Sequence, residues 1–299
     1  MPSLLDGRGI GAGKRTRLHR LLGHPDGRLL LLPYDHGIEH GPRDFFANPP
    51  SADPRYVIEL AIEAGMNGVV LQIGPARKCF PEFAGRVPLV VKLNGKTEIP
   101  PDDEPLSPLN ATVEEALALG ADAVGYTLYV GSPRQDEDLS ALREVRLECE
   151  RYGMPLIVWA YPRGSAITRK GGRDSFYAID YAARVAAEVG ADVVKINWPS
   201  ASREGVPREY DIELTDAERL ERIVRSAGRT LLLLSGGDRV AADLLLERAA
   251  LAIEAGAAGL IFGRNFLKRE WDEAVGLAAK LHQVMTDSAN GSPTRQGAH

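Results

Sequence analysis

Two lysines in the sequence could act as nucleophiles toward a carbonyl group. Lys195 and Lys92 each directly follow a pair of valines. An ammonium group is costly in such apolar surroundings, and burial favours the neutral amine, which attacks carbonyl carbons. A lysine in this position can instead pair with a carboxylate, and of two neighbouring lysines one can stay charged and lower the pKa of the other. The residues alone do not choose between Lys195 and Lys92.

A tyrosine offers a group for proton transfer. Tyr161 lies in the stretch WAYPRG, which begins at Trp159 and includes Arg163. A phenol held close to a reacting carbon can donate or accept a proton, and Trp159 could wall off water. An isolated tyrosine more often packs beneath a loop, so Tyr161 is a candidate acid/base only if other reactive groups lie beside it.

Two glycine-containing segments have the composition of a phosphate site. They are Ser235-Gly236-Gly237 and Gly263-Arg264. Glycines let backbone N–H groups approach an anion, and an arginine adds a charged, planar donor. A single Gly-Gly pair would be weak support, since turns use it constantly. Two such segments near the end of one chain predict a phosphorylated ligand.

The stretch from Asp35 to Pro42, DHGIEHGP, is dense in titratable groups. His36 and His40 could bind a metal with a carboxylate as a further ligand. The glycines and the proline predict a loop, however, and a loop has no helical face to align the two imidazoles. Asp35, His36 and His40 are therefore better interpreted as groups that bind substrate hydroxyls or a second phosphate.

Short apolar runs alternate with segments of helical spacing along the chain. The runs cover Leu29–Tyr34, Gly68–Gln72, Leu89–Lys92, Ala123–Tyr126, Leu156–Trp159, Val193–Ile196, Thr230–Leu234 and Gly259–Phe262. They lack alternating polarity, as strands covered on both faces do. Strands that alternate with helices build parallel sheets. Eight such units in 299 residues predict a single-domain α/β fold, the (β/α)8 TIM barrel.

Glycines support this repeat. Gly65, Gly120, Gly190 and Gly256 each stand between the end of a helical segment and the next apolar run, where a left-handed residue closes a helix. An open doubly wound sheet uses the same loop and is the alternative fold. In a barrel, the carboxyl ends of the strands share one face and carry the active site, which would gather the residues named above.

The composition excludes several classes of protein. The net charge of -5 argues against a nucleic-acid partner bound through phosphates, and the apolar runs are far shorter than the roughly 20 residues of a membrane span. Cys79 and Cys149 are too few for a disulfide framework, which suggests a cytoplasmic protein. We expect residues 1–28 to form a flexible arm and a short capping helix, 29–286 the barrel, and 287–299 a disordered tail.

Several motifs in order give the chain a family resemblance. They are YDHGIEHGPRDF from Tyr34, KLNGKT from Lys92, GADAVGYTLYVGS from Gly120, WAYPRG from Trp159, GADVVKI from Gly190, SGGD from Ser235 and GRN from Gly263. The chain resembles the archaeal-type class I fructose-1,6-bisphosphate aldolases from Leu30 to Arg269. The resemblance implies cleavage of this sugar to dihydroxyacetone phosphate and glyceraldehyde 3-phosphate.

The resemblance also implies roles for residues. Lys195, rather than Lys92, would form a Schiff base, Tyr161 would be the acid/base, and Asp35 would handle substrate hydroxyl protons. The implied substrate contacts are His36, His40, Lys92, Trp159, Arg163, Ile196, Asn197, Ser235, Gly236, Gly237, Gly263 and Arg264. No metal or other cofactor would be needed, and relatives suggest a homo-oligomer, a decamer or similar.

Two alternative functions remain open at this point. A related Schiff-base enzyme of aromatic amino-acid precursor synthesis, similar to 2-amino-3,7-dideoxy-D-threo-hept-6-ulosonate synthase, would keep Lys195 and Tyr161. A non-catalytic phosphosugar-binding protein would keep the glycine segments and Arg264 without a reactive lysine. The charged insertion Ser202–Glu213 departs from the family pattern, and we expect it at the barrel mouth, where it would reshape or shield the pocket.

Overall fold

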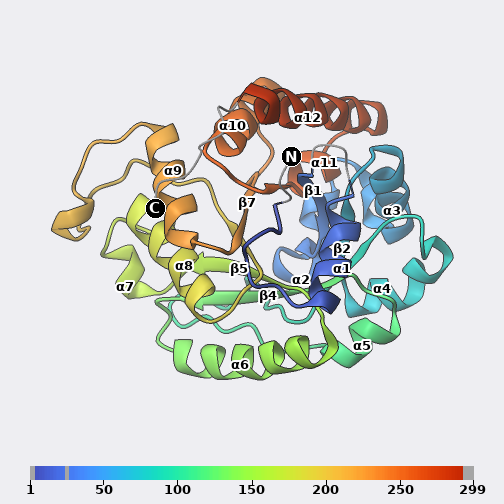
Figure 1. The fold of residues 1–299 in the computed structure, drawn as a ribbon, viewed down its shortest axis with the longest axis horizontal. Coiled ribbons are helices and arrows are strands. Elements are labelled where there is room, and N and C mark those ends of the chain that lie inside the picture. The colour runs from blue at the N-terminus through green and yellow to red at the C-terminus, as the bar shows by residue number, and fades with distance from the viewer. Residues whose placement is uncertain (1–3, 24–26, 292–299) are drawn as a thin grey trace.

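Eight parallel strands close into a barrel in which each strand pairs with the next in sequence order, and β1 pairs with β8 (Figure 1). The computed structural model describes residues 4–23 and 27–291, without the side chains of residues 288–291. The strands are β1 (Leu29–Tyr34), β2 (Gly68–Gln72), β3 (Leu89–Lys92), β4 (Ala123–Val130), β5 (Leu156–Pro162), β6 (Val193–Ile196), β7 (Leu231–Ser235) and β8 (Gly259–Ile261). The barrel predicted from the sequence is confirmed, and the doubly wound sheet is wrong.

β4 and β5 continue by more than one residue beyond their predicted ends. β4 and β5 stay paired from Val124 opposite Leu156 to Val130 opposite Pro162. Both strands are longer than predicted because their backbone hydrogen bonds to each other continue past the purely apolar runs. Tyr161 is consequently part of β5 and not of the loop that follows it.

Helices surround the barrel (Figure 1). The α-helices are α1 (Ala12–Leu21), α2 (His36–Glu39), α3 (Pro54–Glu63), α4 (Ile73–Cys79), α5 (Val113–Ala118), α6 (Gln135–Tyr152), α7 (Ser165–Thr168), α8 (Phe176–Glu188), α9 (Asp216–Ala227), α10 (Ala242–Glu254), α11 (Arg264–Leu267) and α12 (Trp271–Gly291). Short 3-10 helices are η1 (Gly41–Phe45), η2 (Pro49–Ala52), η3 (Phe80–Phe83) and η4 (Arg208–Tyr210). None of the helices in the described residues is long and apolar enough to cross a membrane.

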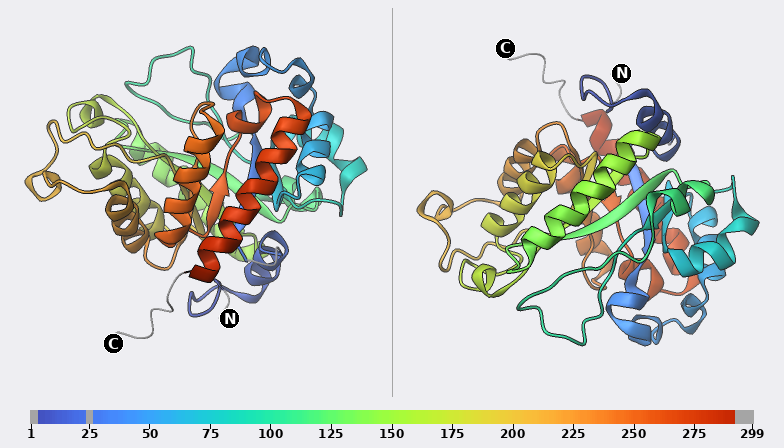
Figure 2. Two further views of the ribbon diagram at one scale, coloured as in Figure 1. Left: turned by 90° about the horizontal axis from the view of Figure 1, so that it is seen from above. Right: turned by 90° about the horizontal axis from the view of Figure 1, so that it is seen from below.

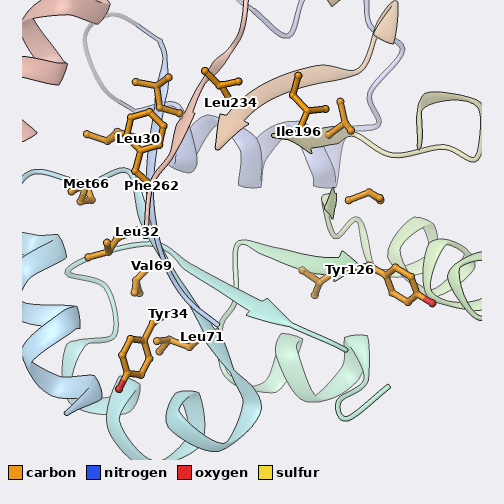
Figure 3. Packing of buried hydrophobic residues seen from close by; sticks show 14 of the residues in the cluster. Leu30, Leu32, Tyr34, Met66, Val69, Leu71, Tyr126, Ile196, Leu234 and Phe262 are labelled. Carbon is orange, nitrogen blue, oxygen red and sulfur yellow. The ribbon is translucent and has the colours of Figure 1, made fainter. Parts of the chain in front are cut away.

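The core has two layers because successive side chains on a strand point to opposite faces. One layer fills the barrel and includes Leu29, Leu31 and Val193. The other lies between strands and helices and includes Leu30, Leu32 and Ile196. Figure 3 shows part of this outer layer, with Leu30, Leu32, Val69 and Leu71 packed together. This alternation decides which residues can reach the interior of the barrel.

The N-terminal end of the barrel is closed by the segment before β1, at the end opposite the β3–α5 loop (Figure 2). The sequence predicted a flexible arm and a short capping helix within residues 1–28, but Leu5 is fully buried and the helix α1 begins at Ala12. Position 13 of this helix is a glycine because a Cβ there would lie 3.0 Å from the Cα of Gly153. The arm is therefore anchored to the barrel floor by Leu5, with Leu4 and Ile10 partly buried against the same cluster.

The C-terminal helix is longer than the sequence suggested. The predicted disordered tail begins at residue 287, whereas α12 extends to Gly291. The helix continues because its buried face reaches Met285 and Gln283 donates to Asp287 one turn later. Residues 292–299 of the predicted tail lie outside the described residues.

Candidate active site

The alternation of side chains brings the candidate residues together at the C-terminal end of the barrel. On β6, Lys195 is the next inward position after Val193, and on β7, Ser235 is the next after Leu233. The same spacing continues along β1 from Leu31 to Asp35. These inward side chains open into a cavity of about 570 Å³. Its lining includes twelve residues that the sequence predicted, namely Asp35, His36, His40, Tyr161, Arg163, Lys195, Asn197, Ser235, Gly236, Gly237, Gly263 and Arg264.

Lys195 is buried without a pairing carboxylate. Its side chain lines the cavity and is 6% exposed, and among the described residues its Nζ has no hydrogen-bond or ion-pair partner. The Nζ lies 5.2 Å from the ring centroid of Trp159 and 5.4 Å from that of Tyr161. Burial lowers the pKa of Lys195 to about 8, with Arg264 acting in the same direction and Asp35 opposing. The uncharged amine is thus accessible near neutral pH.

Lys92 has a different environment. Its Nζ donates to Thr127 Oγ1 at 2.7 Å and to the Asn94 carbonyl at 3.0 Å, and it is fully buried. It does not line the cavity. Burial lowers the pKa of Lys92, and Lys195 adds to this effect, but the cation that lowers the pKa of Lys195 is Arg264 and not Lys92. Lys92 therefore supports the barrel interior, and the implied substrate contact has no geometric basis.

Asp35 and Tyr161 flank the lysine with opposite protonation tendencies. Burial opposes the charge on Asp35, yet Lys195 and His36 hold the pKa of Asp35 below its ordinary value. Burial raises the pKa of Tyr161 well above 10, and nearby carboxyl groups raise it further. The site therefore holds an ionised carboxylate, an amine that can be neutral and a protonated phenol, which suits carbonyl addition followed by proton transfer.

The two histidines lie on the rim formed by α2 and the residue after it. Burial lowers the pKa of His36 to about 4, so its imidazole is neutral near pH 7, and its Nδ1 has no partner among the described residues. His40 pairs through Nδ1 with Asp44 at 2.6 Å, and Asp44 in turn pairs with Lys268 at 2.9 Å. In the described part of the chain, no group of three or more His, Cys, Asp or Glu residues could hold a metal ion.

The segments after β7 and β8 meet beside His36, because β8 pairs with both β7 and β1. Ser235 donates from Oγ to Asn197 Oδ1 at 2.9 Å, and Asn265 donates to the carbonyls of Gly236 and Asp238. Gly263 cannot carry a side chain, because a Cβ would lie 2.0 Å from His36 Cε1. Arg264 is 25% exposed and faces the cavity. The arrangement presents a cation and glycine backbone together, as an anion site requires.

Two further predicted contacts fall outside the cavity lining. Ile196 points outward into the layer between strands and helices, because it neighbours the inward Lys195 on the same strand (Figure 3). Trp159 is fully buried below the cavity, where Lys92 and Lys195 each lie 5.2 Å from its ring centroid. Strand periodicity alone would have excluded Ile196.

The sequence analysis missed three residues that shape the site. Glu39 lines the cavity with a buried Oε1 that has no partner among the described residues. Tyr129, from the unexpected extension of β4, also lines it. Asn265 fixes the β7 loop through Val240 N–H at 3.0 Å as well as the two carbonyls. Glu39 and Asn265 occur inside the quoted motifs, but only the three-dimensional structure shows what surrounds them.

The insertion Ser202–Glu213 projects from the side of the barrel before α9 (Figure 1, Figure 2). No residue of this segment lines the cavity. Its Tyr210 packs against Phe176 and Tyr177 of α8 and donates to Asp180 at 2.6 Å. These contacts hold the segment away from the mouth, so the expectation that it reshapes or shields the pocket is wrong.

Comparisons with known proteins agree with this geometry. Residues 29–269 match the model of the DeoC/LacD family aldolases. The fructose-bisphosphate aldolase class 1 of Thermoproteus tenax is 40% identical over 260 residues, covering 87% of this chain and 90% of that protein. The 2-amino-3,7-dideoxy-D-threo-hept-6-ulosonate synthase of Halobacterium salinarum is 30% identical over 279 residues, covering 93% of this chain and 94% of that protein.

A solved structure is similar in fold as well. It is an archaeal fructose-1,6-bisphosphate aldolase whose catalytic lysine is covalently bound to the carbinolamine intermediate of the substrate. That chain is 37% identical, with a TM-score of 0.78, and the match covers 90% of this chain and 99% of that one. The likeness extends over nearly the whole barrel.

Proposed function

The chain belongs to the DeoC/LacD family of aldolases, and we propose that it is a class I fructose-1,6-bisphosphate aldolase with Lys195 as the nucleophile. The observation that carries the proposal is a buried lysine that has no pairing carboxylate in the described part of the chain and that lies in a cavity also lined by Arg264. Its depressed pKa supports attack as a neutral amine. The products are dihydroxyacetone phosphate and glyceraldehyde 3-phosphate.

The first half of the reaction builds an electron sink. Neutral Lys195 attacks the C2 carbonyl of the sugar and gives a carbinolamine, which loses water to form an iminium. The positive nitrogen accepts the electron pair of the C3–C4 bond when that bond breaks. Asp35, which is ionised, removes the C4 hydroxyl proton, and glyceraldehyde 3-phosphate leaves. No step needs a metal, because the iminium supplies the positive charge.

The second half returns the enzyme to its starting state. The enamine that remains on Lys195 takes a proton at C3 from Tyr161, and hydrolysis of the resulting iminium releases dihydroxyacetone phosphate. Ser235, Gly236 and Gly237 hold one phosphate together with Gly263 and Arg264. The rest of the sugar contacts four residues that line the same cavity, namely His36, His40, Arg163 and Asn197.

The proposal also covers the oligomeric state and the cellular location of the protein. We infer a homo-oligomer, a decamer or similar, which is supported by exposed large apolar side chains such as Phe46 (72%) and Tyr181 (52%). Free thiols at Cys79 and Cys149 support a cytoplasmic location. The related synthase is less well supported than the aldolase, because identity falls from 40% to 30% between the two relatives.

Two assays test the function directly. Fructose 1,6-bisphosphate cleavage is followed by coupled reduction of NAD with glyceraldehyde-3-phosphate dehydrogenase, with and without EDTA. Borohydride is added separately with dihydroxyacetone phosphate, and the adduct is located by peptide mass spectrometry. We expect EDTA-resistant cleavage and an adduct on Lys195. Cleavage abolished by EDTA, or an adduct confined to Lys92, would refute the mechanism.

The phosphate site has its own test. Replacing Arg264→Met removes the cation that faces the cavity, and a charge-assisted hydrogen bond contributes about 2 kcal/mol, so KM for the bisphosphate should rise about 30-fold. Arg239→Met is the matched control, because Arg239 donates to the Lys268 carbonyl on the same rim without lining the cavity. An unchanged KM in Arg264→Met would remove Arg264 from the anion site.

A further inference from the structure

Glu39 presents a carboxyl group that the cycle above does not use. Its Oε1 is buried and has no hydrogen-bond partner in the described part of the chain. The side chain lines the cavity with Asp35, Tyr161 and Lys195. Its own carbonyl accepts the Glu98 N–H at 2.9 Å, which fixes the end of α2 in place. A buried, unpartnered carboxyl oxygen is costly for the fold, so its place in the cavity requires a functional explanation.

Glu39 and Asp35 differ in protonation. Burial raises the pKa of Glu39, and the charge on Asp35 raises it further, whereas Lys195 and His36 keep the pKa of Asp35 low despite burial. Of the two carboxyl groups, Glu39 therefore holds a proton more readily than Asp35. Two carboxyl groups whose environments separate them in this way are suited to separate acid and base roles.

The two carboxyl groups also differ in which neighbour they affect more strongly. Asp35 affects Lys195 more strongly than Glu39 does, whereas Glu39 affects Tyr161 more strongly than Asp35 does. The charged and titratable groups that face Glu39 from the surrounding elements are Asp35 and His40 beside α2, Lys92 on β3, Tyr129 on β4, Tyr161 on β5 and Lys195 on β6. Glu39 is thus the acid associated with the phenol.

Tyr161 needs such an acid. A phenol whose pKa lies well above 10 gives up its proton to carbon only at great cost if a phenolate is left behind. Arg163 lies with its guanidinium carbon 5.2 Å from the ring centroid and offsets part of this cost. A carboxylic acid that lines the same cavity can remove the remainder, because the phenol is protonated again as it donates.

We propose that Glu39 is the proton source for Tyr161 during protonation of the enamine. The C3 carbon of the enamine gains a proton from Tyr161 Oη, and Tyr161 Oη gains one from the Glu39 carboxyl, directly or through one water. Glu39 becomes a carboxylate as the iminium cation forms again on Lys195, so no net charge is created in the cavity. In the direction of carbon–carbon bond formation, the Glu39 carboxylate receives the proton. This inference rests on the proposed function.

The decisive variant is Glu39→Gln in the full chain, since glutamine keeps the shape but cannot pass on a proton. Exchange of the C3 hydrogen of dihydroxyacetone phosphate with D2O, followed by NMR, reports formation and protonation of the enamine without carbon–carbon cleavage. We expect this exchange to fall about 100-fold, as it should in Tyr161→Phe. Borohydride trapping on Lys195 should stay within about threefold of the native rate, because iminium formation does not involve Glu39 in this scheme.

A chemical bypass separates a proton-transfer defect from a structural one. Hexacyanoferrate(III) oxidises the enamine and so consumes it without protonation. Adding it to Glu39→Gln with fructose 1,6-bisphosphate should restore steady glyceraldehyde 3-phosphate release, whereas native enzyme should gain little. A second variant, Glu39→Ala, leaves a space that admits formic acid, and formate should restore C3 exchange in proportion to its protonated fraction.

Three results would overturn the proposal. These are unchanged C3 exchange in Glu39→Gln, equal loss of exchange and trapping, or loss of cleavage that hexacyanoferrate(III) does not relieve. Failure of the proposed function is recognised separately, because native protein would then give no Lys195 adduct at all. Glu82→Gln, at an exposed residue paired with Arg55, controls for the substitution itself.

Discussion

The two ends of the barrel each bury a lysine, with opposite results. At the N-terminal end, Lys14 Nζ lies 2.5 Å from Glu150 Oε1 and 2.9 Å from Asp192 Oδ2. Burial opposes its charge, but Asp192 and Glu150 hold the pKa of Lys14 above 10.5. At the C-terminal end, Lys195 is similarly buried without such a partner, and its pKa falls to about 8. Burial alone does not make a lysine reactive, and the presence or absence of a carboxylate partner decides.

The same difference extends to the surroundings of the two lysines. Beneath the barrel, Leu5, Leu18 and Leu21 form a continuous apolar floor with the inward strand residues. Around the open end, buried polar atoms of His36 and Glu39, which both line the cavity, lack partners among the described residues. Unsatisfied polar groups cost stability, so the molecule keeps them where a substrate can satisfy them. Stability and chemistry are thus assigned to opposite ends of one fold.

Replacing each lysine with methionine is the most sensitive test of the difference between Lys195 and Lys14. Lys195→Met should lower kcat on the order of 10⁵-fold, since the covalent nucleophile is lost. Lys14→Met should change kcat by less than about threefold, because Lys14 lies at the opposite end of the barrel and does not line the cavity. Coupled cleavage assays on the two purified variants measure both effects.

Lys92→Met provides the intermediate case. It removes the hydrogen bonds to Thr127 and Asn94 but leaves Lys195 in place, so borohydride should still trap an adduct on Lys195. The comparison would fail if Lys195→Met kept measurable turnover while Lys92→Met lost the adduct. It would also fail if Lys14→Met proved as inactive as Lys195→Met while still folded by circular dichroism.

Much of this arrangement could be predicted from the sequence. The apolar runs located all eight strands, and the rule for barrel active sites selected Lys195, Asp35 and Tyr161 as candidates. Periodicity could not separate Lys195 from Lys92, because both occupy inward positions at strand ends. What separates them is the hydrogen bonding of Lys92 to Thr127, a residue on another strand. Such long-range contacts leave no trace in local patterns.

The missed and misplaced residues have the same physical origin. Glu39 looked like one member of a charged loop, and its protonation depends on Asp35 and on burial against other strands. The length of β4, which brings Tyr129 to the cavity, depends on pairing with β5. The insertion was expected at the mouth because it follows β6, but aromatic packing of Tyr210 on α8 directs it outward. Each error concerns a tertiary contact.

The N-terminal end can be tested for its role in stability. Lys14→Met leaves the Asp192 carboxylate buried with fewer partners, and we expect the free energy of unfolding to fall by about 2 kcal/mol. This loss in the free energy of unfolding is smaller than that for a fully buried ion pair, because Glu150 is 56% exposed. In addition, burial raises the pKa of Asp192 even beside Lys14, which weakens the charge on its carboxyl group. Denaturant titration of native protein and variant at pH 7 measures the difference.

The pH dependence of this difference has a definite sign. The pKa of Lys14 is higher in the folded than in the unfolded chain, so its stabilisation is complete below about pH 10.5 and is lost as pH rises through the folded value. Glu150→Gln serves as the control and should cost less than about 1 kcal/mol, as exposed pairs do. A Lys14→Met variant as stable as native protein would show that the ion pairs do not stabilise this end.

The smallest expected effect concerns how Asp35 sets the pKa of Lys195. Adduct formation with dihydroxyacetone phosphate and cyanoborohydride should increase roughly tenfold per pH unit up to about pH 8 and then level off. Asp35 raises the pKa of Lys195, so Asp35→Asn should move the midpoint downward by roughly one unit. The shift in the pKa of Lys195 should be clearest in the double variant Asp35→Asn with Glu39→Gln. In that variant, the side chain at position 39 cannot ionise and so cannot replace the negative charge lost from Asp35.

This shift predicts two rates that move in opposite directions. At pH 6.5, Asp35→Asn should form the adduct faster than native enzyme, because more of Lys195 is neutral, and should cleave fructose 1,6-bisphosphate more slowly, because the C4 hydroxyl has lost its base. Asp174→Asn is the control, since Asp174 lines the cavity but is not among the groups that shift the pKa of Lys195. If the midpoint of adduct formation rose in Asp35→Asn, a group other than Asp35 would be responsible for offsetting the effect of burial on the pKa of Lys195. The contrast between Lys195 and Lys14 would then lose its electrostatic basis.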